Sequence, residues 1–599
     1  FGRNAGAIQN LTLRRADVQV NWRQGAASLA LPGLRAVGAL CGENTGRVRN
    51  AAGSVLVRAA LALPQRAGAD TPAAGIGGLV GVSLAGQDAG LYALECEGEV
   101  TGLLLGASAA SSGGQADPAA RCRVAQQVWQ PAGVGGVAGF VRLPGGAQAV
   151  GLRLSNAAAV YGNACVGGVV GSLEGEGAVL AGARNSGPVQ ALAGYDAAVS
   201  PLAGQFFGGV AGYSAGVMLQ GCRNTAAPAQ ENPPQGDFTG GLVGFLCGGM
   251  ANCETGAQAA VYGGRFVGGL AGAVCGGTVA DSRSAGAVCG LDLTGGAVGC
   301  TAADAVLENC AATGSVTALA GSAGGLAGRN EGTIRGGTPG GAPLTVCAQS
   351  GCAGGFAACN TGTVENAALS LDTLRLTGAA GVAGGVAGCN AGAVRGVTVT
   401  AQDPWDLTGL TAASLTAVGG AVGENAGTLE ETSVSLSVSG GGALGRIRSL
   451  GGLAGGNTGT VCGTVEAFAA QDAAGASGPG DAAGGAVGRN AGTVQGCRVS
   501  NLTLQLAGCA EGGQAAGGVG GLVGCNTAEG LVRECVIGGE QPCTVQANAG
   551  AVGGLCGFNA GRIEGCGSAA PLAKLPQFAA WLQEGEAGAD AMTEALARQ

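Results

Sequence analysis

Apolar and polar residues alternate in short stretches along the chain, and glycine- and asparagine-rich segments separate these stretches. In residues 484–500, which read GGAVGRNAGTVQGCRVS, Val494 stands between two polar residues, and Cys497 and Val499 flank Arg498. Alternation with a period of two residues predicts a strand with one buried face. We therefore expect each such segment to form a few short strands that share an apolar face and are joined by tight turns.

The same segment contains residues that tolerate unusual backbone conformations. The Asn-Ala-Gly step at 490–492 predicts a turn, because asparagine and glycine adopt the left-handed backbone region more readily than other residues. Gly484, Gly485 and Gly488 have no Cβ atom, and glycine within a strand often marks the close approach of another backbone. The segment thus predicts a turn of fixed geometry and tight backbone packing.

This pattern is a repeat, with the consensus G-G-[LVA]-x-G-x-N-x-G-[TA]-[VIL]. It occurs about 17 times, mostly at intervals of roughly 27 to 41 residues. Its clear copies begin at Gly324, Gly384, Gly419, Gly451, Gly484 and Gly553. A single copy cannot bury its apolar face, whereas stacked copies build a continuous interior. The sequence therefore predicts an all-β fold, a single elongated parallel β-solenoid (β-helix) of about 17 glycine-rich coils.

Two residue types recur at fixed positions of the repeat. We expect the motif asparagines to lie in turns and to stack, so that their neutral amides satisfy one another from coil to coil. These structural turn asparagines are Asn44, Asn330, Asn360, Asn390, Asn425, Asn457, Asn490, Asn526 and Asn559. A second set is expected to point into the interior as reduced, small apolar side chains. These interior cysteines are Cys222, Cys253, Cys497, Cys535 and Cys566. Neighbouring coils are also close enough for some disulfides, so the redox state stays open.

The repeat resembles the GLUG motif, a G-L-x-G core found in tandem in bacterial surface and secreted proteins. Matching stretches are Gly325-Leu326-Ala327-Gly328-Arg329-Asn330, Gly452-Leu453-Ala454-Gly455-Gly456-Asn457, Gly521-Leu522-Val523-Gly524-Cys525-Asn526 and Gly554-Leu555-Cys556-Gly557-Phe558-Asn559. The resemblance covers almost the whole chain and implies a secreted or surface location. It implies no activity, because such repeats accompany many different neighbouring domains, and the histidine-bearing zinc motif of the metallopeptidases that carry them has no counterpart here.

Composition excludes several classes of protein. Glycine supplies 125 of 599 residues, but it does not recur at every third position, which excludes collagen. A hydrophobic content of 47% and a net charge of −9 argue against disorder and against nucleic-acid binding. The chain has no histidine, which removes Ser-His-Asp and Cys-His catalysis and the commonest metal ligand. Cysteine pairs with C-x-x-C spacing do not occur, so we predict no metal site and no cofactor.

Residues 1–570 form the predicted repeat domain, which opens in the middle of a motif at Phe1 and is expected to be N-terminally truncated. Residues 571–599 lack the glycine rhythm and have helical composition, which predicts a helical cap or linker. Apolar runs stay below the roughly 18 residues that a membrane span needs, so no span is predicted in this segment. Other domains of a longer chain are expected partners.

Four insertions interrupt the rhythm, at 106–131, 226–237, 401–412 and 470–482. Insertions in solenoids map to surface loops that often bind. In 401–412, which reads AQDPWDLTGLTA, Trp405 stands near Asp403 and Asp406. These three residues are candidate ligand contacts, with the indole as a sugar-stacking platform; alternatively, Trp405 covers apolar surface of the coil.

Together these features predict a non-catalytic structural or adhesive scaffold at the cell surface or outside the cell. It would present a rigid rod and its loop insertions to a glycan or host-surface ligand. The alternative is a carbohydrate-active β-helix enzyme, a polysaccharide lyase or glycosidase, which works with carboxylates and arginine rather than histidine. A groove that gathers two or more carboxylates with an arginine would favour the enzyme.

Overall fold

A computed structural model of the chain divides into two compact units, an N-terminal unit (Phe1–Leu344) and a C-terminal unit (Thr345–Gln599). The structure describes residues 1–20, 34–63, 72–84, 90–105, 131–144, 149–192, 205–227, 236–339, 344–411, 415–439, 444, 447–471, 482–506, 518–539, 543–547 and 551–568. The predicted helical segment 571–599 lies outside these residues, as do most of the insertions 106–131, 226–237 and 470–482.

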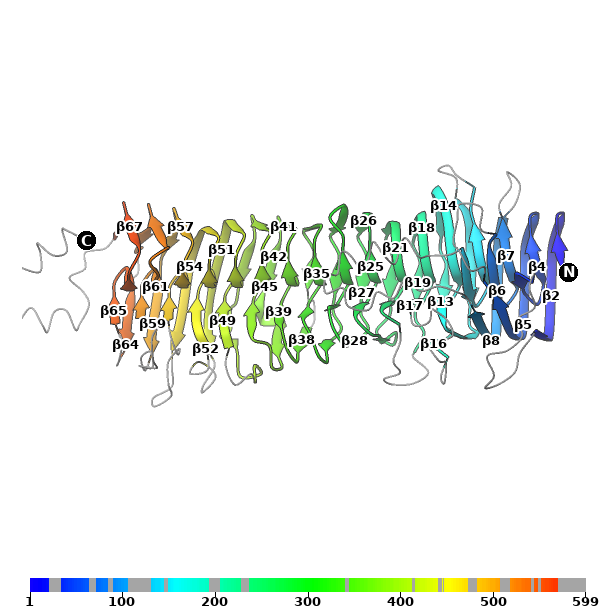
Figure 1. Cartoon of the computed structure of the whole chain (residues 1–599), viewed down its shortest axis with the longest axis horizontal. Helices are drawn as coiled ribbons and strands as arrows, with labels where there is room; N and C mark the ends of the chain where they lie inside the picture. The colour runs from blue at the N-terminus through cyan, green and yellow to red at the C-terminus, as the bar shows by residue number, and fades with distance from the viewer. Residues whose placement is uncertain are drawn as a thin grey trace, which may run out of the picture. The chain divides into compact units, whose positions relative to one another are not determined.

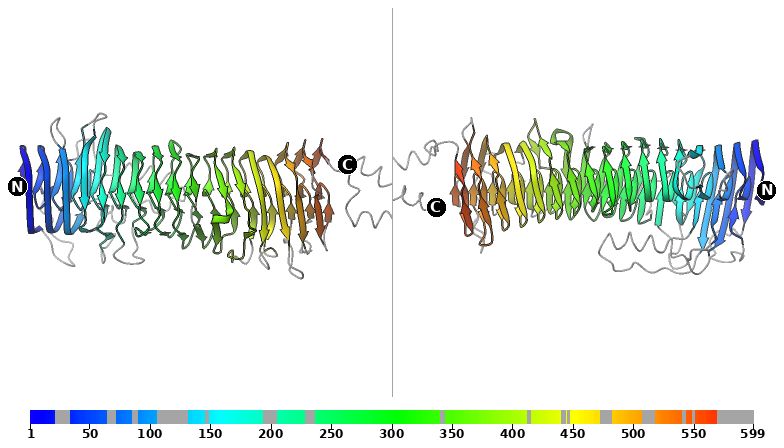
Figure 2. Two further views of the ribbon diagram at one scale, coloured as in Figure 1. Left: turned by 180° about the vertical axis from the view of Figure 1, so that it is seen from behind. Right: turned by 90° about the horizontal axis from the view of Figure 1, so that it is seen from above.

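Each unit is built of parallel β-strands, and each strand pairs with the equivalent strand one repeat later (Figure 1). For example, β45 (Ala387–Asn390) pairs in parallel with β50 (Val422–Asn425), so that Asn390 lies opposite Asn425. In the views of Figure 2, neighbouring strands within each unit point the same way. The prediction of an all-β fold with parallel sheets is confirmed. The described helical structure consists of the 3-10 turn η1 (Leu371–Thr373) and a 3-10 residue at Leu444.

The strand that ends at or just before the first motif glycine, here called the leading strand, belongs to one parallel series in each unit. In the N-terminal unit the leading strands are β3 (Ala36–Val37), β6 (Ala74–Gly77), β9 (Ala132–Gly135), β13 (Ala164–Gly167), β17 (Gln205–Gly208), β20 (Phe238–Gly240), β24 (Phe266–Gly268), β29 (Thr294–Gly295) and β34 (Ala323–Gly324). In the C-terminal unit they are β39 (Cys352–Gly354), β44 (Val382–Gly384), β49 (Leu415–Gly419), β52 (Ile447–Gly451), β55 (Ala482–Gly484), β60 (Gly518–Gly520) and β65 (Ala551–Gly553).

The strand after the glycine pair, here called the following strand, forms a second series. In the N-terminal unit the following strands are β4 (Cys41–Asn44), β7 (Val80–Leu84), β10 (Ala138–Arg142), β14 (Val170–Ala181), β18 (Ala211–Gln220), β21 (Val243–Ala251), β25 (Ala271–Val274), β30 (Val298–Thr301) and β35 (Ala327–Asn330). In the C-terminal unit they are β40 (Ala357–Asn360), β45, β50, β53 (Ala454–Asn457), β56 (Val487–Asn490), β61 (Val523–Asn526) and β66 (Cys556–Asn559).

The glycine pairs permit the close backbone approach that the sequence predicts. A Cβ atom at Gly484 would overlap the carbonyl oxygen of Val487 in the same repeat. One at Gly485 would overlap the carbonyl oxygen of Gly521 in the next repeat. Any side chain at these positions would therefore push the leading and following strands apart or separate neighbouring repeats.

The predicted left-handed turn lies at a different residue. Among the described residues with positive φ, none is a motif asparagine; Asn490, for instance, ends β56. The left-handed positions instead follow the next strand, as at Gly496 (φ 60°), Asn366 (φ 51°) and Glu534 (φ 55°). The turn prediction for the asparagines is therefore wrong in its backbone geometry. Their side chains are needed inside the stack, and glycine, asparagine or a strained residue takes the left-handed step a few residues later.

Each repeat faces two separate interiors. Beyond the asparagine, β46 (Ala393–Arg395), β51 (Thr428–Ser439) and β54 (Thr460–Gln471) place Val394, Leu429 and Val461 in register, and all three are fully buried. The second interior lies between the leading and following strands, in what we call the arch. Across the arch, the Ser449 hydroxyl of β52 donates to the Gly455 carbonyl oxygen of β53 at 2.6 Å.

In the N-terminal unit the arch is filled with aromatic side chains. Phe206, Phe238 and Phe266 come from three successive leading strands, and Tyr213 and Phe245 come from two following strands. Their rings pack with centroids 4.8 to 5.7 Å apart. In the C-terminal unit the following strands place residues of mixed size at the equivalent position, among them Cys389, Glu424 and Gly456.

Candidate functional site

In the C-terminal unit the motif asparagines form a continuous hydrogen-bonded ladder. The Nδ2 atom of each residue donates to the Oδ1 atom of the asparagine one repeat later, over 2.7 to 2.8 Å. The members are Asn360, Asn390, Asn425, Asn457, Asn490, Asn526 and Asn559. The ladder links every described repeat of this unit through side chains as well as through backbone pairing.

Asn457 illustrates how the amides are satisfied. Its Nδ2 atom contacts Asn490 Oδ1 at 2.8 Å, the Gly459 carbonyl oxygen at 3.2 Å and the Thr493 carbonyl oxygen at 3.3 Å. The side chain is 2% exposed. A buried amide without partners would cost about 1 to 3 kcal/mol, so the complete set of bonds is what permits the burial. Because the groups are neutral and mutually bonded, the ladder stabilises the stack rather than binding a cation.

The N-terminal unit places its motif asparagines in similar bonds. Asn44 accepts from Asn4 at 2.7 Å and donates to the Ser83 hydroxyl at 3.1 Å. Asn330 accepts from the Thr301 hydroxyl at 2.7 Å. This unit also contains a second ladder that the motif did not reveal.

In that second ladder Asn156 donates to Asn185 at 2.9 Å, and Asn185 donates to Asn224 at 3.0 Å. The available sequence signal was the Arg-Asn-Ser and Arg-Asn-Thr steps at 184–186 and 223–225, which lie outside the glycine consensus.

The five predicted interior cysteines lie in two columns. The backbone N–H of Cys222 donates to Cys253 Sγ at 3.3 Å, and both side chains are 1% exposed. In the C-terminal unit Cys497, Cys535 and Cys566 occupy equivalent positions of successive repeats. The backbone N–H of Val536 donates to the Cys497 carbonyl oxygen, and that of Gly567 donates to the Cys535 carbonyl oxygen, both at 2.9 Å. Cys566 is half-buried, whereas the other two are buried. Each cysteine directly follows a left-handed residue, which turns its side chain inward.

Surroundings favour the protonated thiol at Cys535 and Cys310, whereas a side-chain hydrogen bond with Cys222 lowers the pKa of Cys253. A side-chain hydrogen bond with Cys497, together with burial, raises the pKa of Cys535 to about 12. Burial raises the pKa of Cys310, which lies in the column of Cys222 and Cys253, to about 12. Because the thiolate is the reactive form, the Cys535 and Cys310 side chains are poor nucleophiles near neutral pH.

We predict that the five column cysteines are thiols in the purified protein. Denaturation without reductant, followed by alkylation and peptide mapping, should find all five alkylated. Native alkylation at pH 8 should be slow at Cys310, because a pKa raised to about 12 leaves little thiolate. Fewer than five thiols in the denatured sample, or fast native labelling of Cys310, would contradict the prediction.

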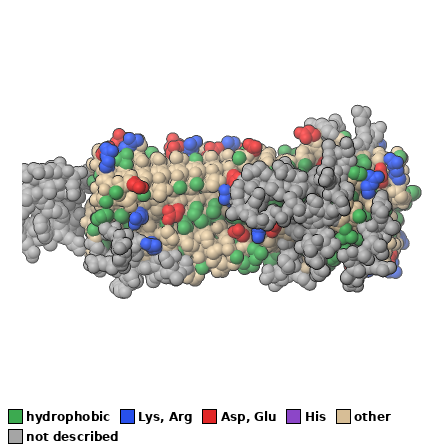
Figure 3. Space-filling model, viewed as in Figure 1, with side chains coloured by type: hydrophobic (Ala, Val, Ile, Leu, Met, Phe, Trp, Pro, Cys, Tyr) green, Lys and Arg blue, Asp and Glu red, His purple; other side chains and the backbone are tan. Residues whose placement is uncertain are grey.

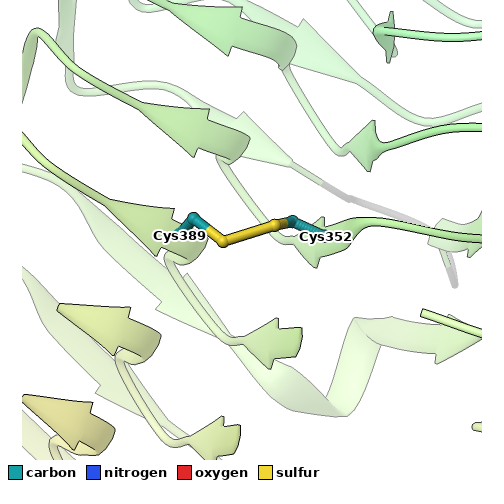
Figure 4. The surroundings of a disulfide bond; sticks show 2 residues. All are labelled: Cys352 and Cys389. Atoms are coloured by element: carbon teal, nitrogen blue, oxygen red, sulfur yellow. A yellow bond between two sulfur atoms is a disulfide. The ribbon is translucent and has the colours of Figure 1, made fainter. Parts of the chain in front are cut away.

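A disulfide joins Cys352 of β39 to Cys389 of β45 across the arch (Figure 4). The two Cα atoms are 6.3 Å apart, and 37 residues separate the cysteines in sequence. Neither residue is among the predicted interior cysteines. The consensus could not reveal this pair, because it joins a leading strand to the following strand of the next repeat, and no other described repeat has cysteine at both positions.

The candidate ligand contact Trp405 is not exposed. It lies in β48 (Trp405–Asp406), pairs with Val438 of β51 and is 2% exposed, while Asp403 and Asp406 are exposed. The buried indole therefore offers no open face for sugar stacking, and its burial favours the alternative that it covers apolar surface of the stack. The two aspartates flank the ring without forming a binding surface with it.

Replacing Trp405 with alanine should destabilise the C-terminal unit by about 3 kcal/mol, because a large buried ring is removed. Replacing it with phenylalanine should cost less than about 1 kcal/mol, because the buried indole N–H has no hydrogen-bond partner to lose. Urea denaturation measures both. Equal losses for the two variants, or no loss for Trp405→Ala, would contradict the buried role.

Carboxylates near arginine lie on exposed strand faces. Glu365, Arg395 and Glu430 stand in register on successive repeats, and Arg395 Nε lies 3.0 Å from Glu430 Oε2. Both partners of that pair are about half exposed. On the face drawn in Figure 3, basic and acidic side chains likewise lie beside one another. This trio matches the residue types of a glycosidase and lies on a strand face where Arg395 and Glu430 are half exposed.

One carboxylate does enter the arch. Glu424 of β50 extends over Gly456, whose missing side chain leaves room for it. Burial raises the pKa of this carboxyl group above its ordinary value, and the positive charge of Arg489 offsets part of the rise. Among the residues that the structure describes, no cluster of three acidic or cysteine side chains is arranged to hold a metal ion.

A hollow in the N-terminal unit is lined by Phe207, Tyr262, Asn185, Asn224 and small residues. None of its lining residues is charged. The hollow therefore lacks the carboxylate pair that a glycosidase requires.

Comparisons with known proteins add no identity. No family model, curated protein or solved structure matches the chain. The likeness to GLUG repeats therefore rests on the motif residues alone. Within the described part of the chain, no helix is both long and apolar enough to cross a bilayer.

Proposed function

We propose that the chain is a non-catalytic β-solenoid scaffold of about 17 GLUG-like coils, which serves a bacterial surface or secreted protein as a stiff support for attachment. The observation that carries the proposal is the asparagine ladder with its in-register strands. From Asn360 to Asn526 the motif asparagines repeat the same neutral, internally satisfied contacts, so this recurring position of the repeat serves stacking.

An extracellular location is part of this proposal. The Cys352–Cys389 disulfide supports it, because disulfides persist in oxidising compartments such as the cell exterior. Contact with a glycan or host-surface ligand would fall to the insertions and to exposed side chains rather than to the buried Trp405. The uncharged lining of the hollow in the N-terminal unit leaves the enzyme alternative without support there.

Two measurements test the proposal. Small-angle scattering of the full chain should give a skewed pair-distance distribution with a long tail, because 17 coils at about 4.8 Å each span about 80 Å. A glycan array and a reducing-sugar assay should show binding without turnover, with heat-denatured chain as the control for non-specific adhesion. A symmetric, globular distribution would contradict the solenoid, and turnover of any polysaccharide would contradict the scaffold.

A further inference from the structure

The disulfide of the C-terminal unit has a third cysteine next to it. Cys389 of β45 lies directly opposite Cys359 of β40 in the parallel register, one repeat earlier on the same sheet. Cys352 lies across the arch on β39, so Cys389 has one cysteine across the arch and another beside it along the sheet. Side chains of residues paired in register in a parallel sheet point to the same side, so the Cys359 and Cys389 side chains share a face.

Both pairs lie within the range of Cα separations at which disulfides form. The bonded pair has a Cα separation of 6.3 Å. Neighbouring parallel strands lie about 4.8 Å apart, and disulfides form at Cα separations of about 4.4 to 6.8 Å. Cys359 and Cys389 are half-buried, whereas Cys352 is 8% exposed. Two of the three cysteines are therefore partly accessible to solvent, which allows proton exchange with water.

We propose that Cys352, Cys359 and Cys389 form a thiol–disulfide exchange site, in which Cys389 pairs alternately with Cys352 and Cys359. The Cys359 thiol loses its proton to solvent, and the thiolate attacks Cys389 Sγ in the usual exchange reaction. A Cys359–Cys389 bond forms as the Cys352–Cys389 bond breaks. The electron pair stays on Cys352 Sγ, which takes a proton from solvent. One disulfide and one thiol are present before and after, so no oxidant or reductant is consumed.

The two pairings differ in what they connect. The Cys352–Cys389 bond ties the leading strand of one repeat to the following strand of the next and so closes the arch. The Cys359–Cys389 bond would join two strands that are already paired through their backbones. Exchange therefore releases the cross-link of the arch while leaving the sheet intact. This goes beyond the proposed scaffold function and does not depend on it.

The test maps the disulfide in the full chain. Wild-type protein is incubated at pH 8, acid-quenched, alkylated with N-ethylmaleimide and digested without reductant by trypsin and chymotrypsin, which cleaves after Phe356 and so separates Cys352 from Cys359. We expect peptides that link Cys389 to Cys352 and peptides that link Cys389 to Cys359. Alkylation of Cys352 should fall at least about tenfold in Cys359→Ser, because exchange is the step that frees it.

Cys347→Ser is the matched control, since it removes a half-buried cysteine outside the trio and should leave both linked pairs in place. If wild-type Cys389 is linked only to Cys352 after overnight incubation, the proposal is overturned. Equal Cys352 alkylation in wild type and Cys359→Ser also overturns it. The wild-type mapping decides the question even if the serine variant fails to fold.

Discussion

At pH 7, replacing Asn457 with aspartate should destabilise the C-terminal unit by about 4 kcal/mol. The native amide donates to Asn490 Oδ1 and accepts from Asn425 Nδ2 within a ladder that excludes water. An ionised carboxylate still accepts from Asn425, but it faces the Asn490 oxygen with a second acceptor and a buried charge. Urea denaturation at pH 7 measures the loss, and hydrogen exchange should place it in the repeats next to residue 457.

The same variant should recover much of this stability at pH 4. Burial and the facing oxygen raise the folded-state pKa of the introduced carboxyl group above its unfolded value. Its stabilising contribution is then present at low pH, where the protonated group can donate to Asn490, and is lost as pH rises. Thr458→Asp, one residue along and exposed, is the matched control and should change stability by less than about 0.5 kcal/mol. A pH-independent loss, or equal effects at the two positions, would refute this explanation.

The substitution Gly485→Asn should unfold the repeats around it and lower the free energy of unfolding by about 4 kcal/mol or more. The substitution Gly496→Asn should change the free energy of unfolding by less than about 0.5 kcal/mol. A Cβ at Gly485 overlaps the Gly521 carbonyl oxygen of the next repeat. A Cβ at Gly496 meets nothing nearer than Cys462 Sγ at 3.8 Å, and its left-handed φ of 60° suits asparagine.

Native repeats already tolerate asparagine at the position equivalent to Gly496, because Asn366 and Asn309 occupy left-handed positions of the same kind. Far-ultraviolet circular dichroism and urea denaturation of both variants decide the outcome. A folded Gly485→Asn protein with native stability would mean that the glycine pairs are not required for close packing.

The features that could be predicted from sequence are those that repeat. Val494 and Val461 recur at the apolar place of the consensus, and both are buried in register. The glycine pair also recurs, because every repeat needs the same close approach. The backbone role of Asn490 was mistaken because the residue type permits two explanations: asparagine favours left-handed turns, and it also forms side-chain ladders. Only the register of neighbouring strands distinguishes them.

The remaining features occur once and had no pattern to reveal them. Cys352 and Cys389 meet because the arch folds a leading strand against the next repeat, a distance along the chain that the consensus does not encode. The aromatic filling of the N-terminal arch, including Phe206 and Phe245, likewise follows no recurring residue type, because Ala273, Cys300 and Arg329 stand in register with Phe245 in the next repeats. Of the two roles that the sequence left open for Trp405, burial favours the one in which the ring covers apolar surface, because the strand β48 turns it inward.

The direction of the asparagine ladder has an evolutionary consequence. From Asn390 to Asn526 every ladder amide donates towards the next repeat and accepts from the previous one, so these rungs of the ladder all have the same polarity. Duplication or deletion of one whole repeat would bring together two asparagines whose donor and acceptor already match. Such a gene can therefore change the number of repeats by unequal recombination without compensating mutations. Chain length becomes a trait that selection can adjust in single steps.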